Sequence, residues 1–112
     1  MKAKGVVRII LRTEDNKKFF GKGPYMLLLK VKELGSLNKA AKEMGMSYSK
    51  AFNVIKSCEK ALNKKFLYRE IGGIKGGGSK LTEDGEKIIE QYEHIVSEMN
   101  EKMNSLLDEL NF

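Results

Sequence analysis

Residues 36–62 restrict the fold most, because they read as two helices joined by a tight turn at Gly45. Helices that cross at a fixed angle need apolar residues at set distances from such a turn. The positions expected to be buried are all apolar: Ala40, Met44, Met46, Ala51 and Val54, with small Ala41 at the closest approach. Glycine tolerates the positive φ that ends a helix, and Ser36 and Ser47 stand where N-caps are needed. The pattern predicts a helix-turn-helix, with an ordinary core hairpin as the alternative.

The charge of the chain is divided between two segments. Residues 1–82 contain 19 Lys and Arg and 6 Asp and Glu, which gives +13. Residues 83–112 contain 2 Lys and 9 Asp and Glu, which gives −7. A solvated surface explains each charge alone but explains this separation poorly. A basic body with an acidic terminal segment instead favours a polyanionic partner for the body.

The composition argues against several classes of function. A chain of 112 residues forms one small domain, and its single cysteine, Cys58, allows no internal disulfide and no cysteine metal cluster. One histidine and no pairing of a nucleophile with a base make an enzyme the least expected class, so we expect no cofactor and no metal. The chain has no apolar run of about 18 residues and no signal-peptide cleavage region, so we expect a cytoplasmic protein without a membrane partner.

The residues before the helix-turn-helix predict a short strand pair and one helix. Residues 5–11 are mostly β-branched and apolar, and a polar turn and Phe19-Phe20 follow them, which favours a hairpin. The first helix should begin with Gly23 as N-cap and Pro24 at its first position, and end at Gly35. Its apolar residues recur at helical spacing and should pack on the helix-turn-helix: Leu27, Leu28, Val31 and Leu34.

The third helix, residues 47–63, has two different sides. At about 100° per residue, an apolar stripe falls on one side and should face the core. This stripe contains Ala51, Val54, Ile55, Cys58 and Leu62, whereas the opposite side carries Ser49, Asn53, Lys56, Ser57 and Lys60, with Tyr48 and Lys50 on its flanks. Hydroxyls, an amide, lysines and an aromatic ring suit base edges and phosphates in a DNA major groove. A solvated helix face is the alternative.

Residues 66–81 predict a β-hairpin wing with a glycine-rich tip at 72–80. A mixed apolar and polar strand at 66–71 precedes the tip, and a short apolar return follows at Leu81. Five glycines would let the backbone lie close to a sugar-phosphate chain, where Lys75 and Lys80 would neutralise phosphates. A nucleotide-binding glycine loop is the rival interpretation, but the Walker pattern is missing. A simple flexible loop is the other alternative.

The last helix should begin after Thr82 and run to about Leu110. Thr82 can cap it, and Glu83 and Asp84 suit the positive end of the helix dipole. About 25 residues at roughly 1.5 Å each give a rod of ~40 Å, too long to bury against so small a body. We therefore expect it to pair with the same helix of a second subunit. The expected dimer interface contains Ile88, Tyr92, Ile95, Met99, Met103, Leu106 and Leu110.

Two runs of this sequence, GSLNKAAKEMGMSYSKAFNVIKSCEKAL and GGIKGGGSKLTEDGEKII, carry a family resemblance. They resemble the N-terminal winged-helix domain of the ModE molybdate-responsive regulators and, more distantly, the DNA-binding domain of LysR-type regulators. The resemblance spans roughly residues 18–98. It implies a dimeric transcription regulator with the wing and third helix at DNA. ModE regulators carry molybdate-binding domains after this module, and this sequence stops at Phe112, so we do not carry molybdate sensing over to it.

We therefore predict a mainly α chain with a small β component. Residues 1–82 would form a winged helix-turn-helix, and residues 83–112 a long dimerisation helix. The predicted function is a homodimeric transcription regulator that binds double-stranded DNA, and no residue pattern indicates an effector ligand. The predicted DNA-binding residues are Ser36, Lys39, Ser47, Tyr48, Ser49, Lys50, Asn53, Lys56, Lys75 and Lys80. The alternatives are an architectural protein with little sequence preference and a protein-interaction subunit.

Overall fold

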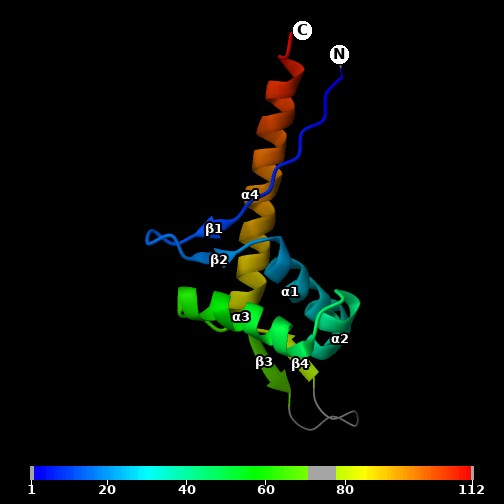
Figure 1. The fold of residues 1–112 in the computed structure, drawn as a ribbon, viewed down its shortest axis with the longest axis vertical. Coiled ribbons are helices and arrows are strands. Elements are labelled where there is room, and N and C mark those ends of the chain that lie inside the picture. The colour runs from blue at the N-terminus through cyan, green and yellow to red at the C-terminus, as the bar shows by residue number, and fades with distance from the viewer. Residues whose placement is uncertain (1, 71–77, 112) are drawn as a thin grey trace.

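A computed structural model describes residues 2–70 and 78–111 and shows a winged-helix body from which one long helix projects (Figure 1). Its elements are β1 (Leu11–Arg12), β2 (Lys18–Phe20), α1 (Lys22–Leu34), α2 (Leu37–Glu43), α3 (Tyr48–Leu62), β3 (Leu67–Glu70), β4 (Gly78–Leu81) and α4 (Glu83–Asp108). The strands form two antiparallel hairpins, β1–β2 and β3–β4. The predicted mainly α fold with a small β component is confirmed.

The helix-turn-helix of α2 and α3 forms around Gly45. Gly45 has a φ of 67°, in the left-handed region that favours glycine. The side-chain oxygens of Ser36 and Ser47 each accept a hydrogen bond, at 3.1 Å, from the backbone N–H groups of Lys39 and Lys50. Buried alanines let the two helices approach each other: Ala40, Ala41 and Ala51. The predicted turn and both predicted caps are confirmed, whereas Met44 and Met46, which were expected to be buried, are only half-buried.

One core joins the three short helices to the start of α4. Phe20 of β2 lies near its centre and makes edge-to-face contacts with Phe66 and Tyr92, at centroid distances of 6.4 and 5.1 Å. The other buried apolar residues include Leu27, Leu28, Val31, Leu37, Ile55 and Ile89. Gly85 of α4 lies so close to the Phe66 carbonyl that a side chain would not fit. The first turns of α4 are therefore part of the body.

The start of α1 differs from the prediction. Gly21 is the N-cap and Lys22 the first helical residue, so the predicted start at Gly23 and Pro24 was wrong. Pro24 fits inside the first turn because the N–H groups there have no partner within the helix. The predicted end is confirmed, since Gly35 has a φ of 68° and its N–H donates to the Val31 carbonyl at 2.7 Å.

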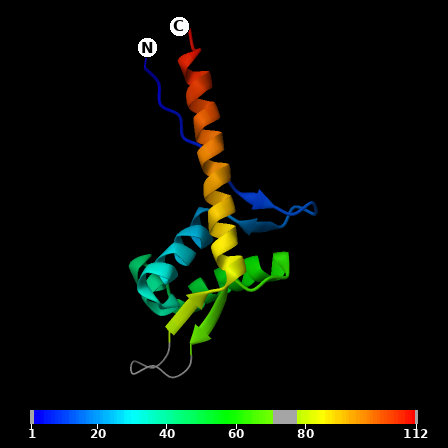
Figure 2. The same cartoon turned by 180° about the vertical axis from the view of Figure 1, so that it is seen from behind.

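Residues 2–10 form an extended arm beside α4. The strand predicted at 5–11 is shortened to Leu11–Arg12, which pairs with β2. Both views show the arm running along the outer part of α4 (Figures 1 and 2). Gly5 packs against the side chains of Met103 and Leu107, and the Tyr92 hydroxyl donates to the Ile9 carbonyl at 2.8 Å. The arm thus covers part of the apolar stripe of α4.

The apolar stripe of α4 is divided between the body and the surface. Thr82 caps the helix by accepting a hydrogen bond from the Gly85 N–H at 3.0 Å, as predicted. Tyr92 is buried in its own chain, so this predicted dimer residue is not open to a second subunit. Helix α4 ends at Asp108, so Leu110 lies beyond it. Met99 and Leu106 are 47% and 51% exposed. Ile88, Ile95 and Met103 are half-buried.

None of the helices in residues 2–70 and 78–111 combines the length and apolar character that a membrane crossing needs.

Candidate nucleic-acid interface

Helix α3 turns a polar side to solvent. The residues predicted for that side and its flanks are exposed: Tyr48, Ser49, Lys50, Asn53, Lys56, Ser57 and Lys60. Of the predicted apolar stripe, Ala51, Ile55 and Cys58 are buried, whereas Val54 and Leu62 are only half-buried. The predicted division of α3 into a core side and a solvent side is confirmed.

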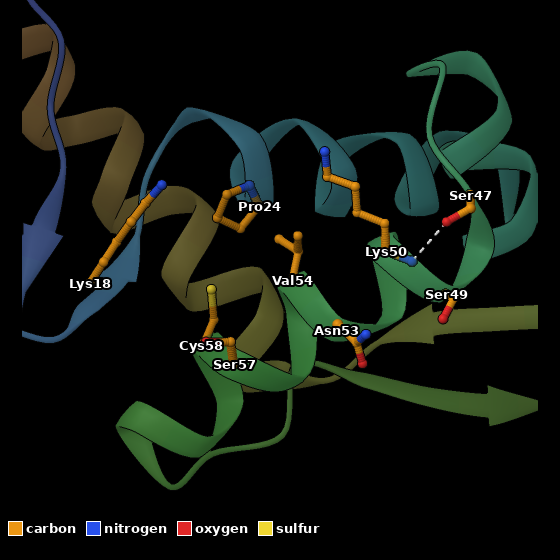
Figure 3. A pocket seen from close by; sticks show the side chains of 9 residues that line it. All are labelled: Lys18, Pro24, Ser47, Ser49, Lys50, Asn53, Val54, Ser57 and Cys58. Atoms are coloured by element: carbon orange, nitrogen blue, oxygen red, sulfur yellow. Dashed lines mark hydrogen bonds between the residues drawn. The ribbon is translucent and has the colours of Figure 1, made fainter.

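A groove of about 610 Å³ runs along one side of α3 (Figure 3). Its lining residues are Ser47, Ser49, Lys50, Asn53, Val54, Ser57 and Cys58 of α3 and its cap, together with Lys18 of β2 and Pro24 of α1. Hydroxyl and amide groups can both donate and accept hydrogen bonds, as the edges of DNA bases require. Burial raises the pKa of the Cys58 thiol to about 11, so this thiol stays neutral near pH 7 and serves packing.

A second groove, of about 460 Å³, lies between α3 and the wing. It is lined by aromatic rings from both elements, and Tyr48 stacks on Phe52 with a centroid distance of 6.1 Å. The guanidinium Nη2 of Arg69, on β3, donates to the Tyr48 hydroxyl at 3.1 Å. The Lys56 ammonium lies 5.5 Å from the centre of the Phe52 ring, a cation–π distance. Tyr48 therefore belongs to the wing side of α3, apart from the Ser49 side.

Two lysines meet beside this second groove. A hydrogen bond between the two side chains, which an amine can accept only in its neutral form, lowers the pKa of Lys65 and raises the pKa of Lys56, and the Lys56 charge lowers the pKa of Lys65 further. The Glu59 carboxylate, 3.6 Å from the Lys56 ammonium, also raises the pKa of Lys56. Neighbouring ammonium groups repel each other, and an anion placed between them relieves that repulsion. The pair is therefore suited to a phosphate group.

The wing is fastened to the body at its base. The buried Glu59 carboxylate accepts hydrogen bonds from the backbone N–H groups of Phe66, at 2.7 Å, and Leu67, at 3.3 Å. The Ser79 N–H donates to the Gly35 carbonyl at 3.0 Å. Strands β3 and β4 pair from Leu67 opposite Leu81 to Glu70 opposite Gly78. Both predicted wing strands are thus present: β3 begins at Leu67, one residue later than predicted, and β4 begins at Gly78, within the predicted tip.

The three remaining lysines that were predicted to bind DNA lie outside the two grooves or outside the described residues. Lys39 is exposed on α2, and Lys80 is exposed on β4. Lys75, with most of the predicted glycine-rich tip, lies outside the described residues.

We expect Glu59→Ala to lower the free energy of unfolding by about 1–3 kcal/mol, because one buried and one partly buried N–H group would lose their acceptor. Denaturant unfolding measures this change. Glu59→Gln keeps a carbonyl oxygen at that position and should lose less. Glu33→Ala, on the surface of α1, is the matched control for removing a carboxylate. A Glu59→Ala protein as stable as the Glu33→Ala protein would contradict the proposed role of Glu59 at the wing base.

Several residues of the second groove were not predicted from the sequence: Phe52, Lys65, Tyr68 and Arg69. Phe52 follows Tyr48 by four residues, and that spacing places both on one flank of a helix. This signal was therefore present in the sequence. Tyr68 and Arg69 reach the groove only because the wing packs beside α3, and no local pattern specifies that contact.

Three relatives extend over most of this chain. The molybdenum transport protein ModE of Azotobacter vinelandii is 32% identical over 76% of the chain, and the transcriptional regulator ModE of Haemophilus influenzae is 31% identical over 74%. The DNA-binding transcriptional dual regulator ModE of Escherichia coli K12 is 29% identical over 90%. The chain spans 32%, 32% and 38% of these three proteins, about a third of their length.

A family model also matches the part of the chain that supplies most of the residues lining the two grooves. Residues 25–86, more than half of the chain, match the family described as bacterial regulatory helix-turn-helix protein, lysR family. The match begins in α1 and ends in the first turn of α4, so it includes the helix-turn-helix and both wing strands. The chain therefore belongs to the LysR family of bacterial regulatory helix-turn-helix proteins, and it is similar to ModE.

Proposed function

We propose that the chain is a transcription regulator that binds double-stranded DNA with sequence selectivity, as a homodimer. The exposed polar side of α3 carries this proposal, because it lies between two grooves that both contain lysines. Membership of a regulatory helix-turn-helix family supports the same function. The net charge of +13 over residues 1–82 suits a polyanionic partner.

In this proposal α3 enters the major groove and the wing lies on the adjacent backbone. Asn53 would pair with an adenine through its amide, and Ser49 would bond a base edge beside it. Lys50 and Lys56 would reach phosphates or guanine. Lys39 of α2 and Lys80 of β4 would contact phosphates, which position the protein without reading sequence.

Pairing of α4 helices would supply the second copy of α3. Met99 and Leu106 of α4 and Leu110 after it are exposed, and Val6 and Ile10 of the neighbouring arm are 84% and 53% exposed. Exposed apolar residues gathered along one rod favour contact with another chain. A symmetric dimer would present two α3 helices to half-sites about one turn of DNA apart, or ~34 Å.

Selection of bound sequences from random duplex DNA tests this function. We expect an enriched inverted repeat, and competition with random DNA should favour the selected sequence at moderate salt. Binding without enrichment would contradict selectivity and favour an architectural protein. Failure to bind any duplex at moderate salt would contradict DNA binding and favour a protein-interaction module.

Asn53→Ala should change which sequence is preferred. Loss of a good base contact costs about 1–3 kcal/mol on the selected sequence and relaxes the preference at one base pair. Lys39→Ala is the matched control, because removing a phosphate contact weakens all sequences alike. Affinities for the selected duplex and its single-base variants measure both effects. An Asn53→Ala protein with unchanged affinity and unchanged preference would contradict the role of Asn53.

A further inference from the structure

The groove between α3 and the wing combines exposed aromatic side chains with cationic ones. Three large aromatic side chains line it, and each is exposed to a considerable degree: Tyr48 38%, Phe52 40% and Tyr68 50%. Three cationic side chains line the same groove: Lys56, Lys65 and Arg69. Exposed aromatic rings are costly in water unless a partner covers them. The groove therefore suits an occupant that offers both apolar surface and negative charge.

A strand of DNA meets both requirements. Its phosphates would pair with the cations, while its sugars and base edges supply apolar surface for the rings. The carboxylate among the lining residues, that of Glu59, is already engaged by the N–H groups of Phe66 and Leu67 and by Lys56. The groove also adjoins the polar side of α3, because Phe52 directly precedes Asn53. A strand whose bases face Asn53 would pass beside Phe52.

Phe52 and Tyr48 differ in what they offer a DNA strand in the groove. The Tyr48 hydroxyl is held by Arg69 of the wing, so Tyr48 fixes the wall of the groove. Phe52 has no polar atom and lines the groove with a side chain that is two-fifths exposed. In the major groove the apolar group that distinguishes one base from the others is the 5-methyl group of thymine, and phenylalanine is among its known partners.

We propose that Phe52 is a specificity-determining residue that packs on the 5-methyl group of a thymine. This inference rests on the proposed function, because it concerns the same bound duplex. Consecutive Cα atoms are about 3.8 Å apart and stacked base pairs about 3.4 Å apart. The thymine therefore lies within about two base pairs of the position that Asn53 reads.

Replacing thymine by deoxyuridine, one position at a time, in the selected duplex tests this inference. The exchange removes only the methyl group and leaves base pairing in place. For the wild-type protein we expect one thymine per half-site at which the exchange weakens binding about fourfold, the effect of one buried methyl group. For Phe52→Ala the exchange at that position should change the affinity far less, because the methyl group would no longer pack against an aromatic ring.

Two controls separate this contact from general damage to α3. Phe52→Leu keeps an apolar side chain and should retain part of the sensitivity to the methyl group. Ser57→Ala, on the side of α3 away from the wing, should keep the full fourfold effect. If the wild-type protein binds its selected duplex and no thymine-to-deoxyuridine exchange changes its affinity, this inference alone is overturned. Equal sensitivity of the wild-type and Phe52→Ala proteins also overturns it. A wild-type protein that binds no duplex overturns the proposed function itself.

Discussion

A protein with Glu in place of both Lys56 and Lys65 should bind every duplex at least ~1,000-fold more weakly than the wild type at about 0.1 M salt. These two ammonium groups adjoin each other beside the groove between α3 and the wing. Each phosphate contact contributes nearly a factor of ten at that salt concentration, and a dimer would lose four such contacts. The new carboxylates would also repel the phosphates.

The salt dependence of binding gives an independent measure of the same contacts. In the milder variant, Lys56→Gln with Lys65→Gln, the plot of log affinity against log salt should become less steep by about 3–4, at about 0.9 per contact. Lys2→Glu with Lys4→Glu, at the far end of the arm, is the matched control for the Lys56→Glu, Lys65→Glu protein, because it changes the net charge by the same amount (Figure 1). An equal loss of affinity in this control would mean that only net charge matters, and would contradict a local contact.

Aspartate in place of both Met99 and Leu106 should convert a dimer into a monomer. The two side chains are about half exposed on α4, and a charge buried in an apolar interface costs far more than the contact supplies. The monomer would lose the gain from linking two half-sites, which is roughly 100- to 10,000-fold. Sedimentation would give the mass, and titration of a duplex with both half-sites would give the affinity.

A second pair of substitutions controls for the added charge. Ser97→Asp with Asn104→Asp has the same seven-residue spacing on α4 and also adds two carboxylates, but on the opposite side of the helix. This control should remain dimeric. Its affinity for the duplex with both half-sites should fall only slightly, because the two added carboxylates are exposed and lie away from the DNA. A wild-type protein with the mass of one chain at micromolar concentration would contradict pairing through α4. So would a Met99→Asp, Leu106→Asp protein that remains dimeric.

The features predicted correctly from the sequence depend on short stretches of chain. The turn at Gly45 needs a residue that tolerates positive φ, and a serine cap bonds an N–H group three residues away. The exposed side of α3 follows from the helical period alone. Such features are decided by neighbouring residues, so a local pattern is sufficient to identify them.

The features that were missed depend on contacts between distant residues. The arm lies on α4 because the Tyr92 hydroxyl bonds the Ile9 carbonyl and Gly5 admits the Met103 side chain. Neither contact leaves a periodic signal, and the β-branched, apolar composition of residues 5–10 therefore predicts a strand instead of an arm. No local pattern indicates the role of Glu59, whose carboxylate is buried against the backbone N–H groups that begin the wing. The groove beside Phe52 likewise depends on a contact between distant residues, because it forms only where the wing packs beside α3.

A titration of the ¹⁵N-labelled protein with its selected duplex, followed by NMR, tests most directly whether α3 and the wing form the DNA-binding surface. The largest changes in amide chemical shift should occur at Ser49, Asn53 and Lys56 of α3 and at Arg69 of β3. Residues in the outer half of α4, such as Glu101, should change little. The largest changes along α4, with α3 unaffected, would contradict the proposed interface.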